Sequence, residues 1–173
     1  MVSHNPEWQE SFKKEAEKIK RIFGEEALDI QHVGSTAIPG ISAKPIIDIA
    51  LIVPSFKGVK SFRTKLEAIG YKLKEDDARG ERIFFTKGPE ANRTHYLHIG
   101  EAGNGYAEDM ILFRDYLRGH KDAAGEYSRL KERLAKEYKD KRETYTEKKK
   151  KFIQGIIRKA GKSRRTLKYL KVI

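Results

Sequence analysis

The sequence predicts an α+β (α/β) fold, in which a mixed β-sheet carries flanking helices and the C-terminal part of the chain is helical. Short β-branched runs bounded by Gly and Pro gather in the first hundred residues, where they predict strands. Later in the chain, apolar residues recur at helical spacing. At 173 residues the chain has the length of one domain. We expect that domain over residues 1–160, with the sheet mostly within 27–99, helices over 107–160, and a basic tail over 161–173.

Each element is predicted from its local pattern. Asn5, Pro6 and Glu7 are typical of a helix start, and the helix is expected to end at Gly24. Five strands are predicted, at 28–33, 45–53, 71–73, 82–86 and 94–99. A second helix is expected from Ser55 to residue 69, and residues 75–81 are expected to form a loop. The helical patterns over 107–160 are interrupted at 119–120 and near residue 140.

The composition excludes several classes of protein. No apolar run reaches the roughly 18 residues that a membrane span needs. The first thirty residues carry glutamates that a signal peptide would not tolerate, so a cytoplasmic protein is expected. There is no cysteine, which excludes disulfides, thiolate nucleophiles and cysteine-based zinc sites. Any metal must therefore be bound by Asp, Glu or His.

Most of the net charge of +12 lies at the C-terminal end. Residues 140–173 hold thirteen Lys and Arg but only three acidic residues. Such a segment attracts polyanions such as nucleic acid, whereas many charge runs are simply the solvated face of a helix. Both interpretations stay open, as does docking of the last residues on the domain or on a partner.

The strongest pattern is the stretch HVGSTAIPGISAKPIIDIAL, in which a Gly34-Ser35 turn precedes Asp48 in an apolar strand. A Walker loop is excluded, because no Lys follows Gly40. Glycine lets the backbone approach a triphosphate, and Ser35 and Thr36 offer hydroxyl and N–H groups at an expected helix start. The alternative is an ordinary turn in which Ser35 only caps the helix.

Asp48 needs a partner, because burying an unpaired carboxylate costs several kcal/mol. It is either a ligand of Mg²⁺, which prefers oxygen donors and bridges to phosphates, or the partner of Lys44 or of an arginine from the helical half. The turn and the aspartate together resemble the signature of the nucleotidyltransferase superfamily. In that signature a second Asp or Glu stands where this sequence has Ala50.

The longer motifs resemble the GrpB family, whose members are assigned to the nucleotidyltransferase fold. The similar segments are HVGSTAIPG with AKPIIDI, then RTHYLH, LFRDYLR and residues 145–152. The resemblance runs from about residue 6 to 160 and implies a nucleotidyltransferase-like mixed sheet, without a settled activity. It implies phosphate- or nucleotide-binding roles for Gly34, Ser35, Thr36, Lys44, Arg114 and Lys149.

Cations are needed because phosphoryl transfer spreads negative charge over the transferred group. Arg114 is expected to be available for an anion, since its neighbour Asp115 would point elsewhere on a helix. Arg82 and Arg93 are weaker candidates. For each basic residue the alternative is a surface ion pair, worth about 0 to 1 kcal/mol.

The strand 94–99 carries two histidines that face opposite ways, because strand side chains alternate. In related nucleotidyltransferases a further carboxylate lies on a neighbouring strand, and His98 or His95 could replace it as a base or metal ligand. The alternative is a core histidine, which is the expectation for His32. We predict Asp48 and His98 as catalytic residues and as ligands of Mg²⁺.

The sequence thus favours a protein that binds a nucleotide or phosphorylated small molecule and, if active, transfers a nucleotidyl group to a small acceptor. Ala50 leaves one carboxylate of the motif, so Mg²⁺ would arrive with the nucleotide, with His98 or Glu81 contributing. Binding without turnover is equally compatible. The alternative function is a noncatalytic nucleic-acid-binding module that uses residues 140–173.

Overall fold

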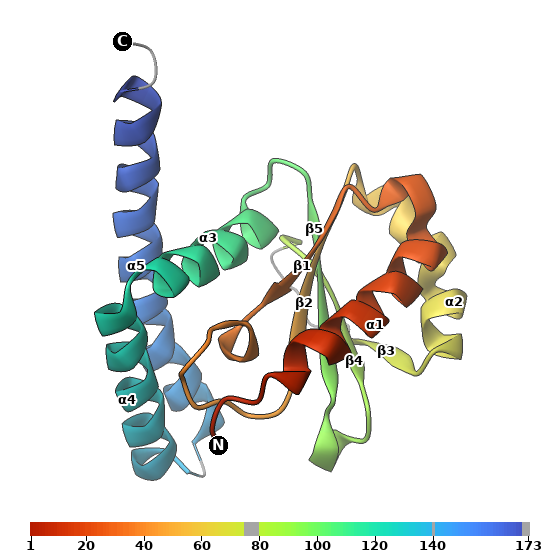
Figure 1. The fold of residues 1–173 in the computed structure, drawn as a ribbon. Coiled ribbons are helices and arrows are strands. Elements are labelled where there is room, and N and C mark those ends of the chain that lie inside the picture. The colour runs from red at the N-terminus through yellow and green to blue at the C-terminus, as the bar shows by residue number, and fades with distance from the viewer. Residues whose placement is uncertain (75–79, 140, 171–173) are drawn as a thin grey trace.

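The computed structural model describes residues 1–74, 80–139 and 141–170. Its strands are β1 (Asp29–Val33), β2 (Ile47–Val53), β3 (Tyr71–Lys74), β4 (Ile83–Lys87) and β5 (His95–Glu101). Its α-helices are α1 (Glu7–Phe23), α2 (Arg63–Ala68), α3 (Tyr106–Gly119), α4 (Lys121–Glu137) and α5 (Arg142–Leu170). The strands form one sheet in the order β1-β2-β5-β4-β3, which confirms the predicted mixed α and β architecture (Figure 1).

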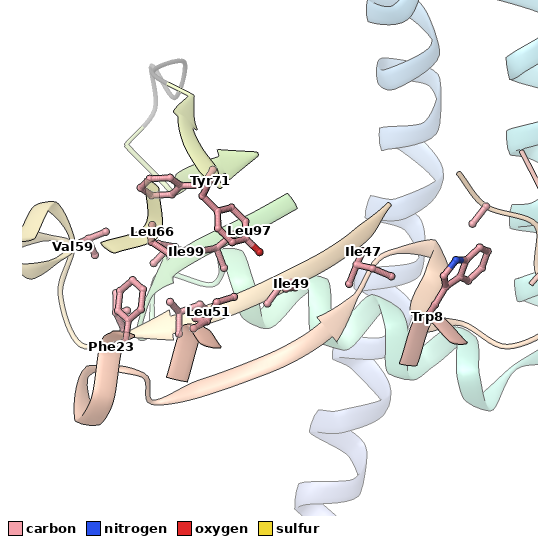
Figure 2. Packing of buried hydrophobic residues seen from close by; sticks show 14 residues of the cluster. Trp8, Phe23, Ile47, Ile49, Leu51, Val59, Leu66, Tyr71, Leu97 and Ile99 are labelled. Carbon is pink, nitrogen blue, oxygen red and sulfur yellow. The ribbon is translucent and has the colours of Figure 1, made fainter. Parts of the chain in front are cut away.

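The sheet is mixed because β2 pairs in parallel with β5, whereas the other neighbouring strands are antiparallel. Side chains of β2 alternate between its two faces. Ile49 and Leu51 point into the main hydrophobic core, which α1 and α2 cover (Figure 2). Asp48 and Ala50 point to the opposite face, where α3 packs on the sheet and α4 and α5 pack on α3 (Figure 1). The candidate site therefore lies between the sheet and the C-terminal helices.

The first helix begins as its sequence predicts. The Asn5 side-chain oxygen accepts a hydrogen bond from the backbone N–H of Glu7 at 2.9 Å. This bond satisfies one of the N–H groups that a helix start leaves without an intrahelical partner. The helix ends at Phe23, and Gly24 follows with a positive φ of 55°.

The helix predicted from Ser55 is only partly correct. Residues Phe56–Phe62 form a 3-10 helix, and α2 begins only at Arg63. A 3-10 helix has three residues per turn, so Phe56, Val59 and Phe62 lie on one side of it. All three pack on the main core, and this packing accounts for the tighter helix.

The helix start expected after Gly34 is present but short. Only Ser35–Ala37 is helical, as a single 3-10 turn, and its N-cap residue is Gly34 rather than Ser35. Pro39 and Gly40, which follow at once, disfavour a longer helix.

The C-terminal helices match the predicted helical region. Their breaks fall at His120 and between Glu137 and Arg142, and α5 continues to Leu170, beyond the expected end of the domain. Its end extends past the rest of the molecule in Figure 1. Across the described residues we find no helix with the length and apolar character that a membrane span requires. The loop predicted at 75–81 falls mostly outside the described residues.

Candidate functional site

Two cavities lie on the sheet face that carries Asp48. The large cavity, of about 590 Å³, is bounded by the Gly34-Ser35 turn, the sheet, and helices α3, α4 and α5. The small cavity, of about 230 Å³, lies between the turn, the start of β2, α4 and α5. Both are lined by Ser35, Asp48 and Lys149. We call these three residues the junction.

Gly34 makes room for the Asp48 carboxylate. Its φ of 72° and ψ of −171° belong to a region that is essentially restricted to glycine. A Cβ atom added to Gly34 would lie 2.4 Å from Asp48 Oδ2. The glycine of the motif therefore allows the carboxylate to lie directly against the turn.

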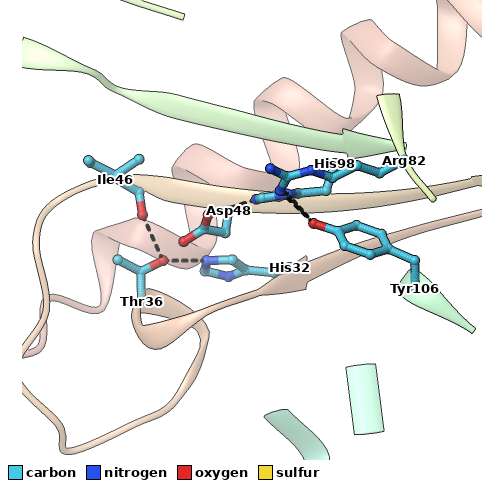
Figure 3. A network of polar contacts seen from close by, with 7 residues as sticks. All are labelled: His32, Thr36, Ile46, Asp48, Arg82, His98 and Tyr106. Carbon is cyan, nitrogen blue, oxygen red and sulfur yellow. Dashed lines mark hydrogen bonds and ion pairs between the residues drawn. The ribbon is translucent and has the colours of Figure 1, made fainter. Parts of the chain in front are cut away.

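Asp48 is paired with His98, from the neighbouring strand. His98 Nε2 lies 3.1 Å from Asp48 Oδ1, and His98 Nδ1 lies 3.0 Å from the Tyr106 hydroxyl (Figure 3). Arg82 donates to that hydroxyl at 2.8 Å. Because the Asp48 carboxylate accepts, His98 Nε2–H donates to it, and Nδ1 of the neutral imidazole then accepts from the Tyr106 hydroxyl. Both ring nitrogens of His98 are engaged in this network.

This network bears on the predicted roles of His98. As predicted, His98 lies on the same face as Asp48, whereas His95 lies on the opposite face, near Glu15. In the observed arrangement His98 has no lone pair left for a metal, so its contact with Asp48 orients the carboxylate instead. Service as a base or metal ligand would require His98 to break one of these two contacts.

Tyr106 is positioned by the loop before α3. Gly105 adopts a positive φ of 85°, and the Asn104 side chain accepts from the Tyr106 N–H at 3.0 Å. The Asn104 amide also donates to the Glu81 carbonyl at 2.8 Å, which ties this loop to the chain that precedes β4. These bonds hold the start of α3 over His98.

His32 is structural, as expected. Its ring contacts the Thr36 hydroxyl at 3.0 Å (Figure 3). It also contacts Gln9 at 3.2 Å and stacks on Phe12. Burial, together with the positive charge of Arg118, lowers the pKa of His32 to about 4. His32 is therefore neutral near pH 7, and with Thr36 it fixes the turn against α1.

Arg114 lines neither cavity. Its guanidinium donates to Asp115 at 2.7 and 2.8 Å, to Gln31 at 2.9 Å and to the His32 carbonyl at 2.7 Å. The expectation that Asp115 points away from Arg114 is wrong. Arg114 is only 6% exposed, and a buried cation needs the counter-charge that Asp115 provides.

The other predicted cations divide between the site and the rest of the fold. Lys44 lines the small cavity, Lys149 lines both cavities, and Arg82 lines the large one. Arg93 instead donates to the Gly88 carbonyl and lines neither cavity. The site also contains Lys131, which the sequence analysis did not select.

The described residues include no group of three His, Asp or Glu side chains placed to hold a metal ion. Glu81 lines the large cavity, but Ala50 cannot contribute a ligand. Ala50 is fully buried and packs with Val33 and with Ala107 of α3. A Mg²⁺ ion that is already bound to phosphates could still use Asp48, because Mg²⁺ commonly takes one or two carboxylates and completes its shell with phosphates and water.

The strand order and the flanking helices define a nucleotidyltransferase-like fold. The chain matches the family model described as "GrpB protein" over residues 1–159, and it belongs to the GrpB family. It is 39% identical over 161 residues to glutamate-rich protein GrpB of Alkalihalophilus pseudofirmus, covering 91% of this chain and 92% of that protein. It is 40% identical over 154 residues to UPF0157 protein YqkA of Bacillus subtilis, covering 89% of this chain. The match spans only 45% of YqkA.

Two solved structures support the fold. The crystal structure of conserved protein GrpB from Enterococcus faecalis has a TM-score of 0.86 and 34% identity, covering 94% of this chain and 98% of that one. The Cid1 poly(U) polymerase with MgGTP bound has a TM-score of 0.53 and 16% identity, covering 78% of this chain and 44% of that one. At this identity the second likeness concerns the fold alone.

Proposed function

We propose that the chain binds a nucleotide with its nucleoside in the large cavity and its phosphates at the junction, and transfers the nucleotidyl group to a small acceptor. The observation that carries this proposal is the junction itself, where Ser35, Asp48 and Lys149 line both cavities. The large cavity has a volume typical of small-molecule sites, which range over about 300–1,000 Å³. Its apolar wall includes Phe113 of α3, Tyr127 of α4 and further side chains of α3 and α5.

In the proposed reaction, an oxygen of the acceptor forms a bond to the α-phosphorus of a nucleoside triphosphate. The bond from that phosphorus to the bridging oxygen breaks, and pyrophosphate leaves with the electron pair. The acceptor proton passes to Asp48, the one carboxylate that lines both cavities among the described residues. His98 orients Asp48, and Lys149 offsets the charge of the phosphates.

Mg²⁺ is part of this proposal as an ion that the nucleotide carries. Asp48 would be its protein ligand, since the site offers a single carboxylate at the junction. When bound, the ion would supply charge neutralisation on the phosphates. Removal of divalent cations should then weaken nucleotide binding without unfolding the protein.

Calorimetry with a panel of nucleoside triphosphates and Mg²⁺ tests the proposal. Asp48→Asn keeps an acceptor for His98 Nε2–H but removes the charge, so we expect it to fold and to bind at least about tenfold more weakly. Asp122→Asn, at an exposed position on α4, is the matched control and should bind like the wild type. If no nucleotide binds and Asp48→Asn leaves stability unchanged, the proposal is refuted.

A second candidate function rests on α5. This helix lines the large cavity with Lys149 and Lys150 and then continues through the basic segment to Leu170. We propose nucleic-acid binding by residues 140–173 as the alternative, with an affinity that falls steeply with salt. Truncation after Ala160 separates the two functions. Loss of RNA or DNA binding with intact nucleotide binding would make the segment an accessory, whereas loss of all binding would favour the module.

A further inference from the structure

The small cavity is rich in cations. Its volume of about 230 Å³ is below the range of typical small-molecule sites, so it suits a group of few atoms. Among the described residues, it is lined by three lysines from three separate segments, Lys44, Lys131 and Lys149. One carboxylate, that of Asp48, also lines it. It also has hydroxyl groups, from Ser35, Thr36, Tyr145 and Thr146. This lining favours a small anion with several oxygens.

Lys131 is buried, and no ion pair to it is found among the described residues. It is 3% exposed, and its Nζ donates to the Ser42 carbonyl at 2.5 Å and lies 4.8 Å from the centre of the Tyr127 ring. The neighbouring Glu132 instead accepts from the Ser42 hydroxyl.

An ammonium group has three N–H donors, and the Ser42 carbonyl takes one of them. A buried charge costs several kcal/mol unless a partner compensates it. Lys131 therefore has N–H donors that the Ser42 carbonyl does not use, and a positive charge that no ion pair among the described residues balances. An anion in the small cavity would accept from those donors and balance that charge.

We infer that the small cavity is a subsite for a chain of phosphate groups, held by Lys131 of α4 together with Lys44 and Lys149. The inference rests on the proposed function, because the chain would extend from a nucleotide in the large cavity through the junction. Ser35 and Asp48 stand where the phosphate chain would cross from one cavity to the other. Free pyrophosphate or inorganic triphosphate presents the same chemistry and would occupy the same place.

Binding at this subsite should be coupled to proton uptake. The charged and titratable residues beside Lys131 or in the same cavity are Glu132 and Tyr127 of α4, Lys149 and Tyr145 of α5, Asp48 of β2, Tyr96 of β5, Lys44, and the N-terminal Met1. Burial, together with the charge of Lys149, lowers the pKa of Lys131 to about 8, and Glu132 partly opposes this. At pH 8 roughly half of the molecules lack this proton. A bound phosphate chain would raise the pKa of Lys131, so the complex would gain the proton.

Calorimetry with inorganic triphosphate at pH 8, in Tris and in Hepes, measures this uptake. For the wild type we expect up to about half a proton gained per molecule bound. Lys131→Met, which replaces the buried cation by an apolar chain of similar length, should abolish the uptake and weaken binding by about tenfold or more. Lys136→Met makes the same charge change at an exposed position of α4 and should alter neither quantity. Thermal melts establish that both variants fold.

The outcomes separate this inference from the proposed function. If nucleotides bind but Lys131→Met binds triphosphate with wild-type affinity and proton uptake, the subsite is refuted and the proposed function stands. If triphosphate binds with uptake that depends on Lys131 but no nucleotide binds, the subsite stands and the proposed function fails. Absence of triphosphate binding to the wild type also overturns the inference.

Discussion

The substitution Gly34→Ala tests whether the turn controls the position of Asp48. Alanine at the observed φ and ψ costs about 1–3 kcal/mol, since this region is essentially restricted to glycine. The new Cβ would also lie 2.4 Å from Asp48 Oδ2 and 2.9 Å from its Cβ and Cγ, so the carboxylate would have to move. Overpacking of this kind adds roughly 1–3 kcal/mol. We therefore expect the free energy of unfolding to fall by about 2–6 kcal/mol.

Gly40→Ala is the matched control. Gly40 also has a positive φ, of 79°, but an added Cβ would meet nothing within 4 Å. It should cost only the backbone strain, about 1–2 kcal/mol. Urea unfolding followed by fluorescence of Trp8, the single tryptophan, measures both changes. Equal losses in the two variants, with wild-type nucleotide affinity in Gly34→Ala, would refute the reasoning.

Three further predictions follow from the polar contacts. ¹⁵N NMR should find the His98 proton on Nε2, because Nδ1 accepts from a tyrosine hydroxyl; a proton on Nδ1 would contradict the network. Burial lowers the pKa of His32 from 6.5 to about 4, so its neutral form stabilises the fold above pH 6.5 and this contribution is lost as the pH falls towards 4. Between pH 7 and 4.5 the free energy of unfolding of His32→Gln should therefore fall by about 2–3 kcal/mol less than that of the wild type. If the two stability curves stay parallel over this range, the prediction is wrong. Glu15→Gln removes the charge that pairs with Lys87 at 2.6 Å, and in urea unfolding it should lower the free energy of unfolding by about 3 kcal/mol. Glu10→Gln, at the exposed pair with Lys14, should lower it by less than about 0.5 kcal/mol.

The strands could be predicted because local composition determines them, but their ends could not be located exactly. The strand predicted from Pro45 begins at Ile47, the first residue whose N–H bonds the chain that leads into β5. The order of the sheet depends on the parallel pairing of β2 with β5, far apart in sequence, and local patterns do not encode it. The spacing of Phe56, Val59 and Phe62 fits a 3-10 helix as well as an α-helix, and contacts with the core decide between them.

The sequence indicated correctly which candidate residues lie together where they share a strand or a short motif. Asp48 follows Gly34 closely in the sequence, and strand alternation was enough to place His98 on the Asp48 face. The sequence did not indicate the surroundings of residues whose position depends on how the helices pack. Arg114 meets β1 rather than the cavity, and Lys131 is buried only because α5 and the segment before β2 enclose it. A lysine within a charged amphipathic helix gives no local signal of such burial.

The structure also gives a physical meaning to Ala50. In register, Ala50 pairs with His98, and on this face it packs against Ala107 of α3. Gly100 of the neighbouring strand β5 also lies against Ala107, and a Cβ added to it would be 2.9 Å from the Ala107 side chain. The start of α3 therefore rests on two positions that must stay small, and a carboxylate at Ala50 would be buried beneath it. Asp48, one step earlier on the same face, is the last position that the cavity reaches. The alanine at position 50 thus coincides with the close approach of α3, which also brings Tyr106 to His98.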